Sequence, residues 1–396
     1  MYDLRMSRGA STVVNTCAGV QPGEQVLIIT EHSKMSIAES LAAAAYAAGA
    51  EATLVVMTPR DLDGQEPPAA IAAAMRASDV FLCAVSRSIT HTHAVREATA
   101  AGARGLVLTQ FTEGMMVRGG IQADFRAIAP RCRAMAAALA GSGSVRLETP
   151  QGTSLSFSAK GRRGNALYGV VDKGQFSTIP TIEANVSPLE GTANGRIVAD
   201  ASVPYLGIGV LREPVCCEVR DGFILSMTGG EQARMLYNDL LSRKDPNVFN
   251  IAELGVGMNP CCSFMGFMLE DEGVEGSVGA HRHRNQHHAG RHGQGRLPLR
   301  PDHDRRYAGG RRPNADRTGA AVPVKRKRAR PGGRALFHAE TYLLASSMAT
   351  ATATVAPTMG LLPMPMRPII STCAGTEEEP ANCASECMRP MVSVMP

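Results

Sequence analysis

The chain has 396 residues, enough for two domains with a large buried core, and its apolar content of 44% is ordinary for a globular protein. No apolar run approaches the ~20 residues that cross a membrane, and the first twenty residues hold no continuous apolar segment of signal-peptide type. This excludes a helical membrane protein. We therefore expect a cytoplasmic protein whose ten cysteines stay reduced.

The net charge of +5 comes from one segment of the chain. Residues 281–334 contain sixteen Lys and Arg against three acids, a local balance of +13, so the remaining residues sum to −8. Six of the ten histidines also lie between residues 281 and 303. The composition therefore breaks sharply at about residue 281.

Short apolar runs alternate with alanine-rich stretches from about residue 23 to residue 142. The runs EQVLIIT, EATLVVM, DVFLCAVS and RGLVLT are separated by helical stretches such as SIAESLAAAAYAAGA. Buried runs of this length between helices predict a parallel α/β sheet domain, which we place at residues 1–142. None of the strand-to-helix turns carries GxGxxG or a phosphate loop, so no nucleotide site is expected. We interpret His91 and His93, at a predicted helix start, as surface histidines.

The hydrophobic period changes after residue 142. SVRLETPQGTSLSFSAKGR alternates polar and apolar residues around Gly152, which predicts a β-hairpin, and the Arg-Asp-Gly sequence at 220–222 predicts another. GGEQARMLYNDLLSRK is a predicted helix. We expect a β-rich α+β domain at residues 143–281. No helical or strand period persists beyond it, so residues 282–396 are predicted to be a basic, disordered C-terminal third.

Two carboxylates in the second domain stand in unusual settings. Glu183 lies in a predicted loop between Pro180 and Pro188, and Glu253 lies among apolar residues before a glycine-rich turn. A row of three acids follows at 270–272. A buried carboxylate must be paired, protonated or bound to a cation. The residue types alone leave structural salt bridges, solvated loops and a metal site open.

The stretches VQPGEQVLII, EPPAAIAAAM, TPQGTSLSFSAKGR, PLEGTANGRIVAD, NIAELGVGMNP and MLEDEGV occur in this order over residues 8–281. Together they resemble the leucyl aminopeptidase family of the aminopeptidase T type, which are metallopeptidases with two metal ions. The resemblance implies that Glu183, Glu253 and His281 are metal ligands for divalent ions such as Zn, Co, Mn or Mg. It assigns no general base. Ile182 stands where the family has a glycine before its first ligand.

The family also uses a later His-x-Asp pair, and no such pair follows His281 in a matching context. A shift of the reading frame by one nucleotide from His281 can turn HRHRNQHHAGRHGQGR into a glycine-rich segment and place His-Tyr-Asp at positions 298–300. We therefore interpret the basic segment as out-of-frame translation. A histidine-rich metal tract and a nucleic-acid-binding arm are the alternatives, although the histidines have no fixed ligand spacing.

These observations predict a metal-dependent aminopeptidase-type hydrolase with a peptide substrate, impaired by loss of the His-x-Asp ligands. An alternative is an Fe(II)-dependent ring-cleaving dioxygenase acting on a dihydroxypyridine, a class similar in outline that has a histidine in place of Glu253. Another alternative is a non-catalytic remnant whose basic tail binds polyanions. We expect no specific nucleic acid and no membrane partner. The sequence leaves open whether the chain forms a homodimer.

Overall fold

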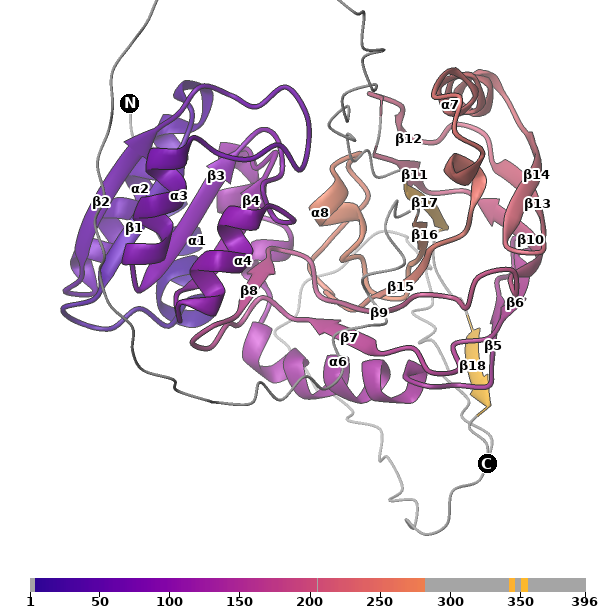
Figure 1. The fold of residues 1–396 in the computed structure, drawn as a ribbon, viewed down its shortest axis with the longest axis horizontal. Helices are drawn as coiled ribbons and strands as arrows, with labels where there is room; N and C mark the ends of the chain where they lie inside the picture. The colour runs from indigo at the N-terminus through magenta and orange to yellow at the C-terminus, as the bar shows by residue number, and fades with distance from the viewer. Residues whose placement is uncertain (1–3, 205, 282–341, 346–349, 355–396) are drawn as a thin grey trace, which may run out of the picture.

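The computed structural model describes residues 4–204, 206–281, 342–345 and 350–354. Figure 1 shows two lobes side by side, the first built from the N-terminal part of the chain and the second from the later part of the described residues. The fold class is the predicted one: a parallel α/β sheet is followed by a β-rich part.

The first lobe is built on a five-stranded parallel sheet with the strand order β2-β1-β3-β4-β8. Its strands are β1 (Gln25–Thr30), β2 (Glu51–Val56), β3 (Val80–Val85), β4 (Arg104–Thr109) and β8 (Phe176–Thr178). Its helices are α1 (Met6–Ser11), η1 (Thr12–Cys17), η2 (His32–Lys34), α2 (Met35–Ala47), α3 (Ala69–Ala77), α4 (His93–Ala100), α5 (Glu113–Val117) and η3 (Gly120–Gln122).

Helices cover both faces of this sheet, which explains why its central strands read as continuous apolar runs. In β3 all six residues are buried. One face packs with α1, η1 and α2 in the larger core cluster, whereas the other packs with α3 and α4. A strand that is buried on both faces shows no polar alternation.

The second lobe contains two largely antiparallel sheets, of six strands (β14-β13-β10-β6-β5-β18) and seven strands (β12-β11-β17-β16-β15-β9-β7). The strands are β5 (Ser144–Glu148), β6 (Ser154–Phe157), β7 (Gly164–Leu167), β9 (Glu183–Val186), β10 (Asn194–Ala199), β11 (Ser202–Val203), β12 (Gly209–Val210), β13 (Val215–Arg220), β14 (Phe223–Thr228), β15 (Glu253–Gly257), β16 (Val278–His281), β17 (Tyr342–Ala345) and β18 (Thr350–Thr354). The helices are α6 (Phe125–Leu139), α7 (Glu231–Ser242), η4 (Pro246–Phe249) and α8 (Met268–Asp271).

Both predicted hairpins are present. The β5–β6 hairpin is antiparallel, and Gly152 in its connection has a φ of 103°. The β13–β14 hairpin turns at Asp221 and Gly222, whose φ values are 50° and 84°. Two consecutive residues with positive φ are typical of a type I′ turn, for which Asp-Gly is a favoured sequence.

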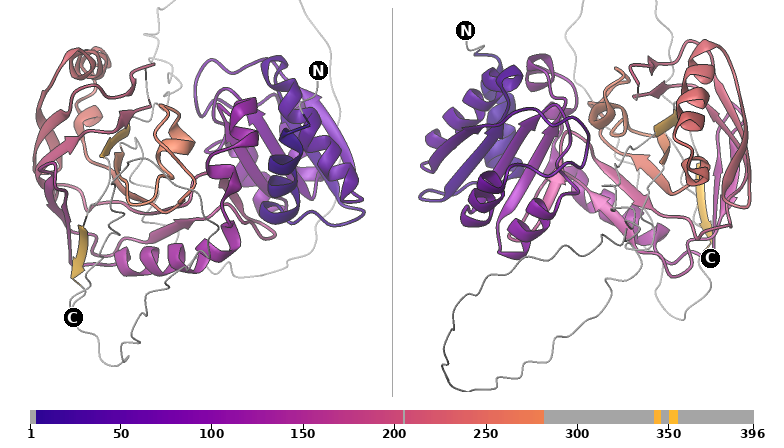
Figure 2. Two further views of the ribbon diagram at one scale, coloured as in Figure 1. Left: turned by 180° about the vertical axis from the view of Figure 1, so that it is seen from behind. Right: turned by 45° about the horizontal axis from the view of Figure 1, so that its top comes forward.

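The chain crosses between the lobes more often than a boundary at residue 142 predicts. Strand β8 comes from the second part of the sequence but pairs in parallel with β4 of the first sheet. Helix α6 precedes the boundary but packs against β7 and β9, and Figure 2 shows it from behind at the base of the second lobe. A three-residue strand and an amphipathic helix carry no sequence signal for which lobe they join.

Two strands come from the region where the sequence predicted no regular element. Strand β17 pairs with β11 and β16, and β18 pairs with β5 at an edge of the six-stranded sheet. The Thr residues of β18 suit a strand, because β-branched residues are enriched in strands. Nine residues of the predicted C-terminal third are therefore in strands, and residues 282–341, 346–349 and 355–396 lie outside the described part of the chain.

Three further expectations concern the histidines at the start of α4, the cysteines and the length of apolar helices. His91 and His93 are exposed, as predicted. The seven described cysteines are free thiols, and four of them are buried. Among the described helices, none combines the length and apolar character of a membrane span.

Candidate metal centre

The three predicted ligands lie on three neighbouring strands of the seven-stranded sheet. Glu183 is the first residue of β9, Glu253 is the first residue of β15, and His281 is the last residue of β16. The strands lie in the order β16-β15-β9. Glu183 was expected in a loop; it lies in a strand because pairing with β15, distant in sequence, extends the backbone there.

The strand register places Glu253 directly opposite His281 at one end of the site. Directly opposed residues of antiparallel strands share a face, with Cβ atoms about 4.5–5.5 Å apart. Glu183 is opposite Gly257. Since residues two and four apart along a strand share a face, all three positions lie on one face of the sheet.

The side chain of Glu183 runs along the sheet toward Glu253. A Cβ atom added to Gly255 would lie 2.7 Å from both Cδ and Oε2 of Glu183 and 3.0 Å from Oε1. The carboxylate therefore lies over Gly255, two residues from Glu253, which is roughly 7 Å along a strand. Glycine at position 255 leaves the room for this arrangement.

The amide side chain of Asn185 holds the Glu183 carboxylate and is itself held by Asn165 of β7. Asn185 Nδ2 donates to Glu183 Oε1 at 2.8 Å, and Asn165 Nδ2 donates to Asn185 Oδ1 at 3.0 Å. Glu183 is 2% exposed and Asn185 is 6% exposed. Because burying an ionised carboxylate is costly, these hydrogen bonds are a condition for keeping the group there.

The opposite face of the same strands is apolar. Four of its residues belong to the larger core cluster, namely Ala184, Val186, Leu254 and Val278. One face thus carries polar residues and glycines and the other carries core residues, although β9 is buried at all four positions and β15 at four of five. The core thus fixes the strands whose other face bears the candidate ligands.

The three-ligand set itself remains a proposal. The structure describes the backbone of His281, whereas its side chain lies outside the described atoms. Among the side chains that are described, no group of three His, Cys, Asp or Glu has an arrangement that could hold a metal ion.

The acid row at 270–272 is a buried structural feature between the lobes. Glu270 is 1% exposed, and its Oε1 accepts from the backbone N–H of Gly120 in the first lobe at 2.8 Å. Asp271 accepts from Met265, Gly266 and Ser202. Burial raises the pKa of both carboxyls. The sequence showed the acids but gave no sign that they face buried backbone N–H groups.

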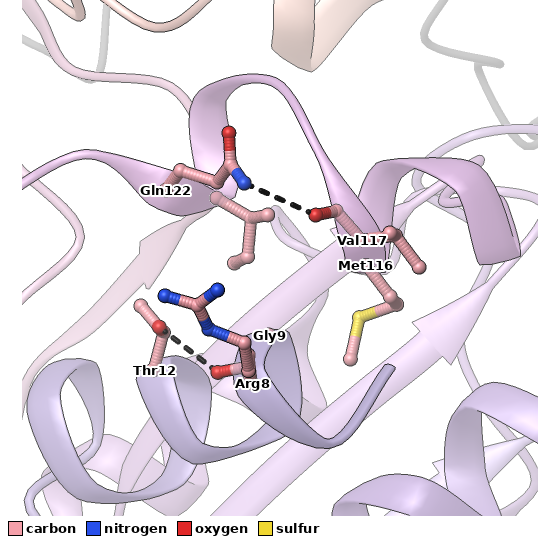
Figure 3. Close-up of a pocket in the computed structure, with 7 residues that line it drawn as sticks. Arg8, Gly9, Thr12, Met116, Val117 and Gln122 are labelled. Carbon is pink, nitrogen blue, oxygen red and sulfur yellow. Dashed lines mark hydrogen bonds between the residues drawn. The ribbon is translucent and has the colours of Figure 1, made fainter. Parts of the chain in front are cut away.

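A small cavity of about 130 Å³ lies in the first lobe, apart from the candidate ligands. Figure 3 shows its lining between α1, η1 and the α5–η3 region. The hydrogen bonds drawn there are local: Thr12 Oγ1 donates to the Arg8 carbonyl, and Gln122 Nε2 donates to the Val117 carbonyl. None of the predicted site residues lines this cavity.

Comparison with known proteins identifies the family. The model of the 2,5-dihydroxypyridine 5,6-dioxygenase (NicX) family matches residues 7–282. The chain belongs to this family. The match ends one residue after His281, where the composition changes. The expected extent of family resemblance, residues 8–281, agrees with this range, whereas the family that matches is the dioxygenase family.

A curated relative and two solved structures agree with this placement. The 2,5-dihydroxypyridine 5,6-dioxygenase of Pseudomonas putida KT2440 is 29% identical over 106 residues, which span 26% of this chain and 30% of the relative. The structure of a 2,5-dihydroxypyridine dioxygenase from the same strain matches with a TM-score of 0.61 at 17% identity, over 70% of this chain and 86% of that one.

Wild-type AmpT from Thermus thermophilus matches with a TM-score of 0.51, also at 17% identity, over 70% of this chain and 85% of that one. At this identity the likeness shows a shared fold. The expected resemblance to aminopeptidase T therefore holds at the level of fold, and the family match does not extend it to peptidase activity.

Proposed function

We propose that the chain is a metal-dependent, ring-cleaving dioxygenase acting on a hydroxylated pyridine. The family match over residues 7–282 carries this proposal. The curated relative, a 2,5-dihydroxypyridine 5,6-dioxygenase that is 29% identical over 106 residues, supports it as well. It replaces the aminopeptidase as the main interpretation of the sequence.

The donor types of the three proposed ligands suit a divalent metal ion. Carboxylate oxygens and an imidazole nitrogen suit borderline and hard divalent ions, and Glu253, His281 and Glu183 would hold the ion on one face of the sheet. When bound, Fe(II) would supply the oxygen chemistry. Glu183, kept buried over Gly255 by Asn185, would present a fixed carboxylate to it. A site with two histidines and one carboxylate would need another imidazole.

A second candidate is the aminopeptidase-type hydrolase, favoured by the two carboxylates Glu183 and Glu253 on one face. A pair of carboxylates is the usual support for two metal ions that activate water for hydrolysis. Zn, Co, Mn or Mg would then be the metal, and a peptide the substrate.

Two assays on the purified chain separate these functions. Oxygen uptake and loss of 2,5-dihydroxypyridine on addition of Fe(II) are expected for the dioxygenase. Release of leucine from leucyl peptides with Zn²⁺, Co²⁺ or Mn²⁺ is expected for the hydrolase. Glu253→Ala should abolish the activity, whereas Glu39→Ala, an exposed position on α2, should leave it unchanged. Full activity in Glu253→Ala would refute the placement of the metal.

A third outcome belongs to the non-catalytic alternative. Absence of both activities and of metal binding, together with nucleic-acid binding that persists at physiological salt, would contradict both enzyme proposals. Binding that disappears as salt rises reflects only the basic segment 281–334.

A further inference from the structure

We infer that Asn185 and Asn165 are positioning residues, which orient the Glu183 carboxylate toward the metal ion. This inference rests on the proposed function, since it assumes that Glu183 is a metal ligand. It assigns a role to two side chains that lie next to Glu183 on the same face of the seven-stranded sheet. Groups that hydrogen-bond to a metal ligand fix its orientation and tune the affinity of the site.

The register puts the three side chains in a fixed relation. Asn165 of β7 is directly opposite Asn185 of β9, and Glu183 lies two residues before Asn185 on the same strand. All three therefore share one face of the sheet. The hydrogen bonds run in one direction, from Asn165 Nδ2 to Asn185 Oδ1 and from Asn185 Nδ2 to Glu183 Oε1.

The direction of these two hydrogen bonds has a physical cause. The amide of Asn185 has a donor end and an acceptor end, and a flip would turn its oxygen toward the oxygen of the Glu183 carboxylate. Asn165 opposes the flip, because its own Nδ2 occupies Asn185 Oδ1. The outer amide thus keeps the inner amide donating, and the inner amide holds Oε1 of the carboxylate.

The two amides differ in burial, which makes the inference testable without unfolding the protein. Asn185 is 6% exposed, whereas Asn165 is exposed on the edge strand β7. Replacing a surface side chain usually changes stability little. A metal effect of Asn165→Ala would therefore not reflect a damaged fold.

The experiment measures Mn²⁺ and Co²⁺ binding to the EDTA-treated full chain, by electron paramagnetic resonance for Mn²⁺ and by visible absorption for Co²⁺. Asn185→Leu, which removes the donor at similar volume, is expected to raise the Kd about 10–100-fold and to alter the Co²⁺ spectrum. Asn165→Ala is expected to raise the Kd by a smaller factor. In the Asn185→Leu background, Asn165→Ala should have no further effect, because its action passes through Asn185.

Thr153→Val is the matched control. Thr153 is 2% exposed, and its hydroxyl hydrogen-bonds to backbone atoms of Val198 in the six-stranded sheet. Its loss removes a buried side-chain hydrogen bond away from the candidate ligands. Thr153→Val should therefore keep the Kd and the Co²⁺ spectrum of the wild type.

The outcomes separate this inference from the proposed function. If Glu183→Gln loses metal affinity while Asn185→Leu keeps the wild-type Kd and spectrum, the positioning role is wrong and the metal site stands. If the wild-type chain binds neither ion, the metal centre and the inference both fall. Equal effects of Asn185→Leu and Thr153→Val would also overturn the inference, since a general loss of stability would then explain both.

Discussion

Gly255→Ala is the substitution that tests the path of the Glu183 side chain. Ordinary contact with a Cβ atom begins at 3.4 Å, and the added Cβ would lie 2.7 Å from Cδ and Oε2, so the carboxylate must move by about 0.7 Å. If the carboxylate moves away from Asn185 by this amount, its 2.8 Å hydrogen bond lengthens to about 3.5 Å, which is too long for a good N–H···O hydrogen bond. The substitution therefore acts on a buried charged group rather than on the strand backbone.

The expected cost follows from the lost hydrogen bond. A hydrogen bond to a charged group contributes about 1.5–3 kcal/mol. Replacing glycine by alanine returns about 0.4–1 kcal/mol, because it restricts the unfolded chain. Gly255→Ala should therefore lower the free energy of unfolding by about 1–2 kcal/mol. It should also weaken Mn²⁺ binding.

Urea denaturation followed by circular dichroism measures the change, with Gly143→Ala as the control. Gly143 has nothing within 4 Å of its added Cβ and no positive φ, so its substitution should be neutral or slightly stabilising. In a Glu183→Ala background the cost of Gly255→Ala should disappear, because the obstructing side chain is gone. An unchanged cost in that background would refute the reasoning.

Three further predictions concern buried acids, thiols and the basic segment. Burial raises the pKa of Glu270, so the folded protein favours the protonated carboxyl and loses stability as pH rises through the folded-state pKa. Glu270→Gln should therefore gain stability relative to wild type over that rise in pH, and a difference in denaturation midpoint that is constant with pH would contradict this. Burial raises the pKa of Cys132 to about 12, so peptide mapping after an iodoacetamide pulse should find the partly exposed Cys216 alkylated before Cys132. Equal labelling of these two cysteines would show that burial does not control their reactivity. A variant carrying the frame-shifted sequence, with His at position 298 and Asp at 300, should gain metal-dependent thermal stability, and no gain in melting temperature with Mn²⁺ would count against the frame-shift interpretation.

The sequence predicted those features that depend on local pattern. Apolar runs of six residues predicted the central strands β1, β3 and β4, and Asp-Gly predicted the β13–β14 turn, because burial on both faces and positive φ leave a direct signature. Strand β8 was missed because Phe176–Thr178 is too short to show a period.

The candidate site shows the limit of local pattern more clearly. Residue types and family resemblance singled out Glu183, Glu253 and His281, and the structure places them on adjacent strands. The role of Gly255 was invisible in the sequence, since it depends on a side chain 72 positions away that reaches it only through the register of β9 with β15. Asn185 was missed for the same reason.

Three properties of the chain change at or next to His281. It is the last residue of β16, the family match ends one residue later, and the basic composition starts there. Whatever ligands a complete centre takes from later in the chain must therefore come from sequence that the family model does not match. Three protein donors bind a divalent ion more weakly than a full set, because water must occupy the remaining positions. The hydrogen bonds that fix Glu183 then matter more, since each remaining ligand contributes a larger share of the affinity.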